Sequence, residues 1–269
     1  MKNGCVAVRD TDMYYVSFGL GDKTLVVLPG LSDGLATVKG KALLLKGPYK
    51  RFLKEYTVYM FSRKNRMPEG YTIREMAEDQ ALAMRALGIG RAAVLGVSQG
   101  GMVAQYLAAG HPELVDKLIL AVTAPCANDV VKGAVEGWIA MAEQGDHVRL
   151  MADTAEKMYS RAYLEKNRKL FPLVAKLTRP RSYERFFRNA YAILAFDARE
   201  ELPKICCPTL IICGDDDNTV GDEAPRELNE GIPGSRVYVY HGLGHGVFEE
   251  AKDFYDRVYG FCEEDPASR

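Results

Sequence analysis

Leu95-Gly96-Val97-Ser98-Gln99-Gly100-Gly101 is the stretch of this 269-residue chain that decides its fold. It holds the pattern Gly-x-Ser-x-Gly between an apolar run at 92–96 and a helical pattern at 99–109. The glycines let neighbouring backbone pass where a Cβ would clash, and the tight strand-to-helix turn lifts the serine hydroxyl clear of the sheet. The turn also places the serine at the positive end of a helix, which favours developing negative charge. Ser98 is therefore the predicted nucleophile; for the motif alone, a glycine-rich turn with a structural serine is the alternative.

Short apolar runs typical of strands alternate with helical patterns on both sides of this turn. The helical patterns outside the central region lie at 72–87, 99–109 and 247–261, and the first shows apolar residues at the spacing of one helix face. Strands alternating with helices predict an α/β fold in which helices cover both faces of a mostly parallel sheet. The expected strands lie at 6–9, 14–18, 24–28, 57–61, 92–96, 117–122, 209–213 and 237–240.

The region 127–199 interrupts this alternation, because it contains several helical patterns rich in aromatic residues and no convincing strand. An all-helical insertion of this length exceeds what a crossover between parallel strands requires. We therefore expect a helical cap over the carboxyl edge of the sheet, where open α/β sheets bind ligands. The predicted organisation is an α/β core formed by 1–126 and 200–269, with a cap formed by 127–199; ordinary crossover helices and a long loop are the alternative. The polar tail 263–269 is expected to fray.

A serine hydroxyl needs a base at neutral pH, and the chain offers His111, His147, His241 and His245. His111 is expected at a helix end away from the carboxyl edge, and His147 is expected to be exposed within a polar sequence. His241 and His245 follow the last expected strand, so both belong at the carboxyl edge with Ser98. His245 is the predicted base, because a glycine and an apolar helix start follow it and its loop can carry the imidazole over the serine. His241 is the alternative.

The base in turn needs a carboxylate that fixes its tautomer and stabilises the imidazolium. Asp215, Asp216 and Asp217 follow the strand expected at 209–213. The first two lie in the turn directly after Gly214, where carboxylates often cap a turn or face water. Asp217 lies far enough beyond that glycine to turn back toward the histidine loop. It is the predicted partner of the histidine, with Asp216 as the alternative.

The oxyanion formed in acyl transfer needs positioned N–H donors. The backbone N–H of Gln99, directly after the serine, is one predicted donor. The loop after the strand at 24–28 reads Leu-Pro-Gly-Leu-Ser-Asp-Gly over 28–34, and the N–H of Leu31 is the second predicted donor. A plain glycine and proline turn is the alternative for this loop.

Taken together, these pieces resemble the α/β-hydrolase superfamily over nearly the whole chain outside the cap. The resemblance implies an eight-stranded, mostly parallel sheet, a cap inserted after the sixth strand and no cofactor. Two features depart from the family: Pro29 stands where many members have histidine, and the segment 61–68 is basic and lacks the glycines usual there. The matching segments, in the superfamily's order Ser, Asp, His, are LPGLSDG at 28–34, GVSQGG at 96–101, GDDDNTV at 214–220 and HGLGHGVF at 241–248.

Composition narrows the expected partners to a small-molecule substrate. With 35 Lys and Arg against 36 Asp and Glu, the formal net charge is −1, which provides no electrostatic argument for binding nucleic acid or an anionic membrane. The chain does not open on a signal-peptide pattern, and no apolar run approaches the roughly 18 residues of a spanning helix, so a cytoplasmic protein is expected. Its six scattered cysteines include no Cys-x-x-Cys pair, so neither a metal site nor a disulfide framework is predicted. The sequence is compatible with a homo-oligomer.

The predicted function is hydrolysis of a small or medium ester, lactone or thioester through an acyl-enzyme on Ser98. Hydrolysis of a C–C bond by the same triad is one alternative, and a binding module with little turnover is another. Between 157 and 188 the expected cap carries ten basic residues against two acidic ones. This run is expected to be mainly a solvated face; one or two arginines that reach into the pocket to bind a substrate anion are the alternative.

Overall fold

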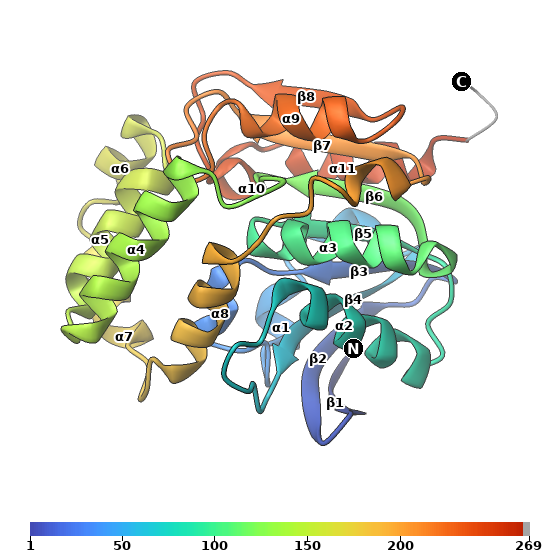
Figure 1. Ribbon diagram of the computed structural model, residues 1–269, viewed down its shortest axis with the longest axis horizontal. Helices are drawn as coiled ribbons and strands as arrows, with labels where there is room; N and C mark the ends of the chain where they lie inside the picture. Colours follow the sequence, from blue (N-terminus) through green and yellow to red (C-terminus); the bar gives the residue numbers. More distant parts are fainter. Residues whose placement is uncertain (266–269) are drawn as a thin grey trace.

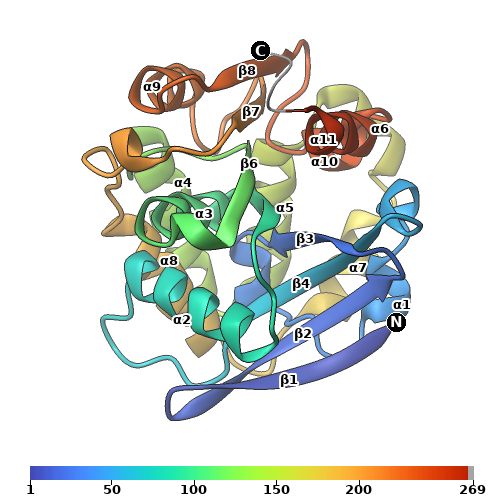
Figure 2. The ribbon, with the colours of Figure 1, turned by 90° about the vertical axis from the view of Figure 1, so that its right-hand side faces the viewer.

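An eight-stranded sheet crosses the computed structural model of the protein, which describes residues 1–265 (Figures 1 and 2). The strands stand in the order β1-β2-β4-β3-β5-β6-β7-β8, and all pairs from β4 to β8 are parallel, whereas β1 and β2 form the antiparallel edge. The predicted eight-stranded, mostly parallel sheet is thus confirmed. Its strands are β1 (Lys2–Val8), β2 (Thr11–Gly19), β3 (Lys23–Leu28), β4 (Tyr56–Lys64), β5 (Ala92–Val97), β6 (Val115–Ala121), β7 (Thr209–Gly214) and β8 (Arg236–Tyr240).

Alternate residues of the central strands pack into two separate hydrophobic cores, one on each face of the sheet. Along β3, Val26 and Leu28 join the first core, whereas Leu25 and Val27 join the second. A period of two is what a strand buried on both faces produces. The first core lies under α2 (Ile73–Ala86), α3 (Gln99–Gly110) and α9 (Ala224–Gly231), and the second under α1 (Ala42–Leu45), α10 (Val247–Glu250) and α11 (Phe254–Glu263) (Figure 2).

Three local expectations about this core are wrong. The strand expected at 57–61 continues to Lys64, so half of the segment read as a basic loop belongs to β4. The helix expected at 247–261 is two helices, because Ala251 takes an extended conformation with φ −78° and ψ 114°. The tail is not frayed at its start, since Glu263 ends α11 and pairs with Lys23 Nζ at 2.7 Å. Residues 266–269 of that expected tail lie outside the described part of the chain.

Five helices follow β6 and precede β7, and they form the cap that was expected after the sixth strand. In Figure 1, α4 to α7 gather at one end of the molecule and α8 lies between them and the sheet. We propose 127–199 as the limits of this cap domain, because its two ends pair: Ala127 N–H donates to Phe196 O at 2.8 Å and Ala198 N–H to Pro125 O at 2.8 Å. The helices are α4 (Asp129–Glu143), α5 (His147–Met158), α6 (Arg161–Asn167), α7 (Phe171–Thr178) and α8 (Glu184–Leu194).

Within residues 1–265, none of the helices has both the length and the apolar character needed to cross a bilayer.

Candidate active site

The turn from β5 to α3 presents Ser98 in strained backbone geometry. Its φ of 54° and ψ of −121° lie in a region that residues with a Cβ seldom occupy. The flanking glycines make the turn possible: a Cβ on Gly96 would lie 2.6 Å from Gly100 O, and a Cβ on Gly100 would collide with Leu28 O. The Ser98 N–H donates to Ala121 O of β6 at 2.9 Å, so the turn is anchored to the neighbouring strand.

The imidazole of His245 connects this serine to a carboxylate. Its Nε2 lies 2.9 Å from Ser98 Oγ, and its Nδ1 lies 2.8 Å from Asp217 Oδ2 and 3.1 Å from Asp217 Oδ1. His245 and Asp217 are 3% and 5% exposed, so the link from histidine to aspartate is shielded from water. This geometry is compatible with a tautomer that donates from Nδ1 to Asp217 and accepts the serine proton at Nε2.

The carboxylate of Asp217 is held by its own loop. Its Oδ1 accepts the N–H groups of Thr219 at 2.9 Å and Val220 at 3.0 Å. Burial acts to raise the pKa of the Asp217 carboxyl, but His245 and these two N–H donors outweigh it and hold the pKa below its ordinary value. Asp216 is exposed, and its side-chain Oδ1 accepts a hydrogen bond from Asn218 Nδ2 at 3.2 Å. The structure therefore places Asp217, and not Asp216, beside the histidine.

The other three histidines lie elsewhere. His241 has an 86% exposed side chain and pairs with Asp215 Oδ2 at 2.8 Å, so these two residues shape the loop after β8. His111 caps the end of α3 and lies 3.1 Å from Glu78 Oε1. His147 contradicts the expectation of exposure: it is 3% exposed, because the cap packs over it, and burial lowers its pKa.

The two predicted oxyanion donors belong to segments that border Ser98: Gln99 follows it in the chain, and Leu31 follows Gly30, which lies against it. Neither the Leu31 N–H nor the Gln99 N–H donates to another group within residues 1–265. The loop after β3 touches the serine directly, because a Cβ on Gly30 would lie 3.2 Å from Ser98 Cβ and 3.6 Å from Ser98 Oγ. Leu31 follows that glycine and begins a short 3-10 turn, η1 (Leu31–Gly34). Two unpaired N–H groups beside a nucleophile are suited to stabilising an oxyanion.

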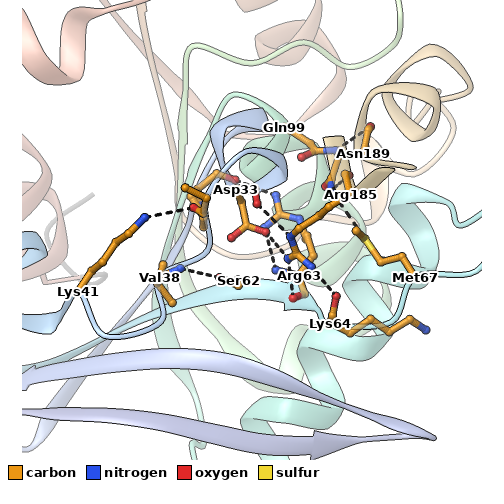
Figure 3. A network of polar contacts seen from close by, with 12 residues as sticks. Asp33, Val38, Lys41, Ser62, Arg63, Lys64, Met67, Gln99, Arg185 and Asn189 are labelled. Atoms are coloured by element: carbon orange, nitrogen blue, oxygen red, sulfur yellow. Dashed lines mark hydrogen bonds and ion pairs between the residues drawn. The ribbon is translucent and has the colours of Figure 1, made fainter. Parts of the chain in front are cut away.

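A polar network that sequence reasoning missed holds this loop (Figure 3). Buried Asp33 of η1 joins Arg63 at the end of β4 and Arg185 of the cap helix α8. Arg185 lies 152 residues from Asp33 along the chain, so no local pattern could pair them. The signals present in the sequence were an acidic residue in the loop after β3, Asp33, and two arginines, Arg63 and Arg185, in segments rich in basic residues.

The histidine loop is also in contact with the cap. The Gly246 N–H donates to Met158 O at the end of α5 at 2.7 Å. Next to it, the Ser160 N–H donates to Glu250 Oε1 of α10 at 3.0 Å. Both loops that serve Ser98 are therefore bonded to the cap.

Most basic residues of the cap lie on its surface, as expected for a solvated face. Three are partly buried: Arg185, Arg188 and Lys157 have side chains that are 18%, 27% and 31% exposed, and Arg185 points toward Asp33. Between 157 and 188 the exposed ones are Arg161, Lys166, Arg168, Lys169, Lys176, Arg179 and Arg181. Across residues 1–265, no three His, Cys, Asp or Glu side chains gather as a metal site would require.

Comparison with known proteins finds hydrolases among the sequence relatives and among the structures of the same fold. RutD of Cronobacter sakazakii, which is named as a candidate carbamate hydrolase, is 27% identical over 219 residues, covering 71% of this chain and 75% of that protein. The enol-lactonase of Burkholderia xenovorans LB400 superposes with a TM-score of 0.82 at 25% identity, covering 97% of this chain and 100% of that one. A meta-cleavage product hydrolase of Pseudomonas fluorescens IP01 has the same fold, with a TM-score of 0.77 at 22% identity over 96% of this chain and 97% of its own.

The family assignment rests on a longer stretch than any single motif. The sequence profile of the alpha/beta hydrolase fold matches residues 59–252, which include the serine turn, the cap, the aspartate loop and the histidine loop. With this match and the eight-stranded sheet carrying Ser98 at its carboxyl edge, the chain belongs to the alpha/beta hydrolase fold family.

Proposed function

We propose that this protein is a serine hydrolase that cleaves a small or medium ester, lactone or thioester through an acyl-enzyme. The observation that carries the proposal is the continuous chain of contacts from Ser98 Oγ through His245 to Asp217, with distances of 2.9 Å and 2.8 Å. A serine aligned with a neutral imidazole in this way is an activated nucleophile.

In the proposed reaction, Ser98 Oγ attacks the substrate carbonyl carbon and passes its proton to His245 Nε2. The carbonyl oxygen becomes an oxyanion that accepts the N–H groups of Leu31 and Gln99. Collapse of this intermediate breaks the bond to the leaving group, which takes the proton from Nε2 and departs as an alcohol or thiol. Water, deprotonated by the same Nε2, then attacks the acyl carbon. The bond from this carbon to Ser98 Oγ breaks, Ser98 Oγ takes the proton back from Nε2, and the acid departs. Asp217 keeps its charge throughout and stabilises the imidazolium.

Two similarities support a carbonyl substrate of this kind. The enol-lactonase of Burkholderia xenovorans opens a lactone by name, and RutD is named for carbamates. Esters, lactones and carbamates all offer a carbonyl carbon to a serine nucleophile. The substrate panel should therefore contain p-nitrophenyl esters of increasing acyl length, simple lactones and an aryl carbamate.

A fluorophosphonate probe tests the proposal without knowledge of the substrate. Such probes react with an activated serine, whose oxygen displaces fluoride from phosphorus. We expect the wild-type protein to be labelled and the Ser98→Ala variant to remain unlabelled, with Ser235→Ala, directly before β8, as the control that keeps Ser98. If the folded wild-type protein is not labelled and turns over no member of the panel, the protein is a binding module and the proposed function is wrong.

A further inference from the structure

The loop that carries Leu31 cannot hold its shape alone. It consists of Pro29, Gly30 and the single 3-10 turn η1, and η1 begins without a side-chain cap. A donor in an oxyanion hole must be placed within about half an ångström to act on the transition state. The rigidity therefore has to come from side chains outside the loop.

The side chain of Asp33 bonds this loop to neighbouring elements. Its residue is 2% exposed, and its Oδ2 accepts the Arg63 N–H at 3.0 Å and Arg185 Nη2 at 2.6 Å (Figure 3). The other oxygen, Oδ1, is buried and has no hydrogen-bond partner within residues 1–265. All hydrogen bonds of the Asp33 carboxylate within residues 1–265 are therefore accepted by Oδ2, and the one from Arg185 is charge-assisted.

Arg185 gives most of its donors to the loop and to the adjacent strand end. Its Nε donates to Asp33 O at 3.0 Å, its Nη1 to Lys64 O at 2.8 Å and its Nη2 also to Arg63 O at 2.8 Å. A planar guanidinium that bonds one carboxylate and three carbonyls fixes all of them relative to one another, which a lysine ammonium cannot do. These bonds leave little of Arg185 to bind a substrate anion.

Two further contacts restrain this loop, one at the carbonyl of Pro29 and one at Gly34. Arg63 Nη2 donates to Pro29 O at 2.7 Å, from a side chain whose residue is 3% exposed. Helix α8 itself lies against the loop, since a Cβ on Gly34 would lie 2.9 Å from Phe186 Cα. The loop is therefore confined on the strand side by Arg63 and on the cap side by α8.

We propose that Arg185 is a positioning residue for the oxyanion donor of Leu31, so that a cap helix sets the geometry of the catalytic loop. This inference rests on the serine-hydrolase function proposed above. The cap is then more than a wall of the substrate pocket: the oxyanion hole is complete only while α8 is docked. The loss of Arg185 should impair the transition state more than substrate binding, because the oxyanion exists only in the former.

The test compares three variants with the wild-type protein. Arg185→Met removes the planar guanidinium but keeps most of the side-chain volume. Arg185→Lys keeps a positive charge beside Asp33 without the planar guanidinium. Arg181→Met is the matched control, because Arg181 is an exposed cap arginine with no hydrogen bond or ion pair within residues 1–265. Measured quantities are the second-order rate constant for fluorophosphonate labelling, kcat and KM on any ester that the wild type hydrolyses, and Tm.

We expect Arg185→Met to lower both the labelling rate constant and kcat about 10- to 100-fold, less than the loss of a whole oxyanion donor, with KM changed less than about threefold. Arg185→Lys should fall between this variant and the wild type, and Arg181→Met should match the wild type. Equal labelling rates in wild type and folded Arg185→Lys or Arg185→Met, with only Tm lowered, would overturn the inference and leave Arg185 as a cap anchor. A wild-type protein that is not labelled at all would instead contradict the proposed function, so the two failures are distinguishable.

Discussion

At the scale of single residues, Asp217 and Asp216 differ in environment and not in chemistry. Asp217 is buried and bonded to His245, whereas its neighbour is exposed. We expect Asp217→Asn to lower kcat about 10⁴-fold, because an amide favours the wrong histidine tautomer. Asp216→Asn, which removes the same charge one residue away, should stay within about twofold of the wild type. Steady-state kinetics on one hydrolysed ester checks both, and a large loss in Asp216→Asn would mean that the wrong aspartate has been assigned.

Gly30 provides a second test at this scale, which concerns the space around the proposed nucleophile, Ser98. Its φ of −74° and ψ of −162° suit alanine, but the added Cβ would lie 3.2 Å from Ser98 Cβ. Gly30→Ala should therefore leave Tm nearly unchanged while lowering kcat about 10- to 100-fold, as expected when reacting groups are displaced. Unchanged kcat in this variant would show that the loop does not lie against the serine during the reaction.

Residues that follow parallel strands were predictable from the sequence, whereas residues that meet through the cap were not. Ser98, Asp217 and His245 each follow a recognisable strand, and the carboxyl ends of parallel strands share one edge. Their roles stay predictions, but their meeting follows from topology. Asp33 and Arg185 meet because α8 packs on η1, and no periodicity or spacing in the sequence contains that information.

At the scale of elements, the positions of the strands along the chain were well predicted, while helix limits and cap burial were less so. Ala251 divides the last helical pattern because its extended backbone interrupts a periodicity that continues through it. His147 was expected to be exposed because its neighbours in sequence are polar. In the structure its Nε2 lies 3.3 Å from Thr178 Oγ1 of α7, and α5 packs against α7. Tertiary contacts within the cap thus outweighed local composition.

The burial of His147 makes the cap sensitive to acid. Its pKa is lowered, so the folded protein holds the neutral ring while the unfolded chain takes up a proton as the pH falls. The stability is therefore present above the ordinary histidine pKa, about 6.5, and decreases as the pH falls below it. We expect Tm to drop between about pH 7.5 and pH 5, and to drop less in His147→Gln, whose amide can still donate to Thr178. The same decrease in both proteins would assign the acid sensitivity to other groups.

At the scale of the whole molecule, the cap bonds to both loops that serve Ser98. On one side, Arg185 of α8 holds the loop of Leu31. On the other, Met158 O accepts the Gly246 N–H beside His245. Figure 1 shows the cap helices spanning the end of the sheet where these loops lie. Because the cap touches both loops, its docking can bring together the proposed oxyanion donor and the proposed base.

A variant that weakens the contact between the cap and the histidine loop should therefore also increase amide exchange in the segment that holds the loop of Leu31. Glu250→Ala removes the acceptor of the Ser160 N–H, a half-buried contact between α10 and the start of α6. We expect exchange of the Gly246 amide to accelerate roughly fivefold, as the loss of about 1 kcal/mol predicts. The Arg63 amide, which donates to Asp33 on the far side, should accelerate as well if the cap moves as one body. Hydrogen exchange read by mass spectrometry reports both, with Glu230→Ala on the exposed face of α9 as the control. Acceleration confined to the Gly246 peptide would mean that the two contacts open independently and that the cap does not couple the base to the oxyanion loop.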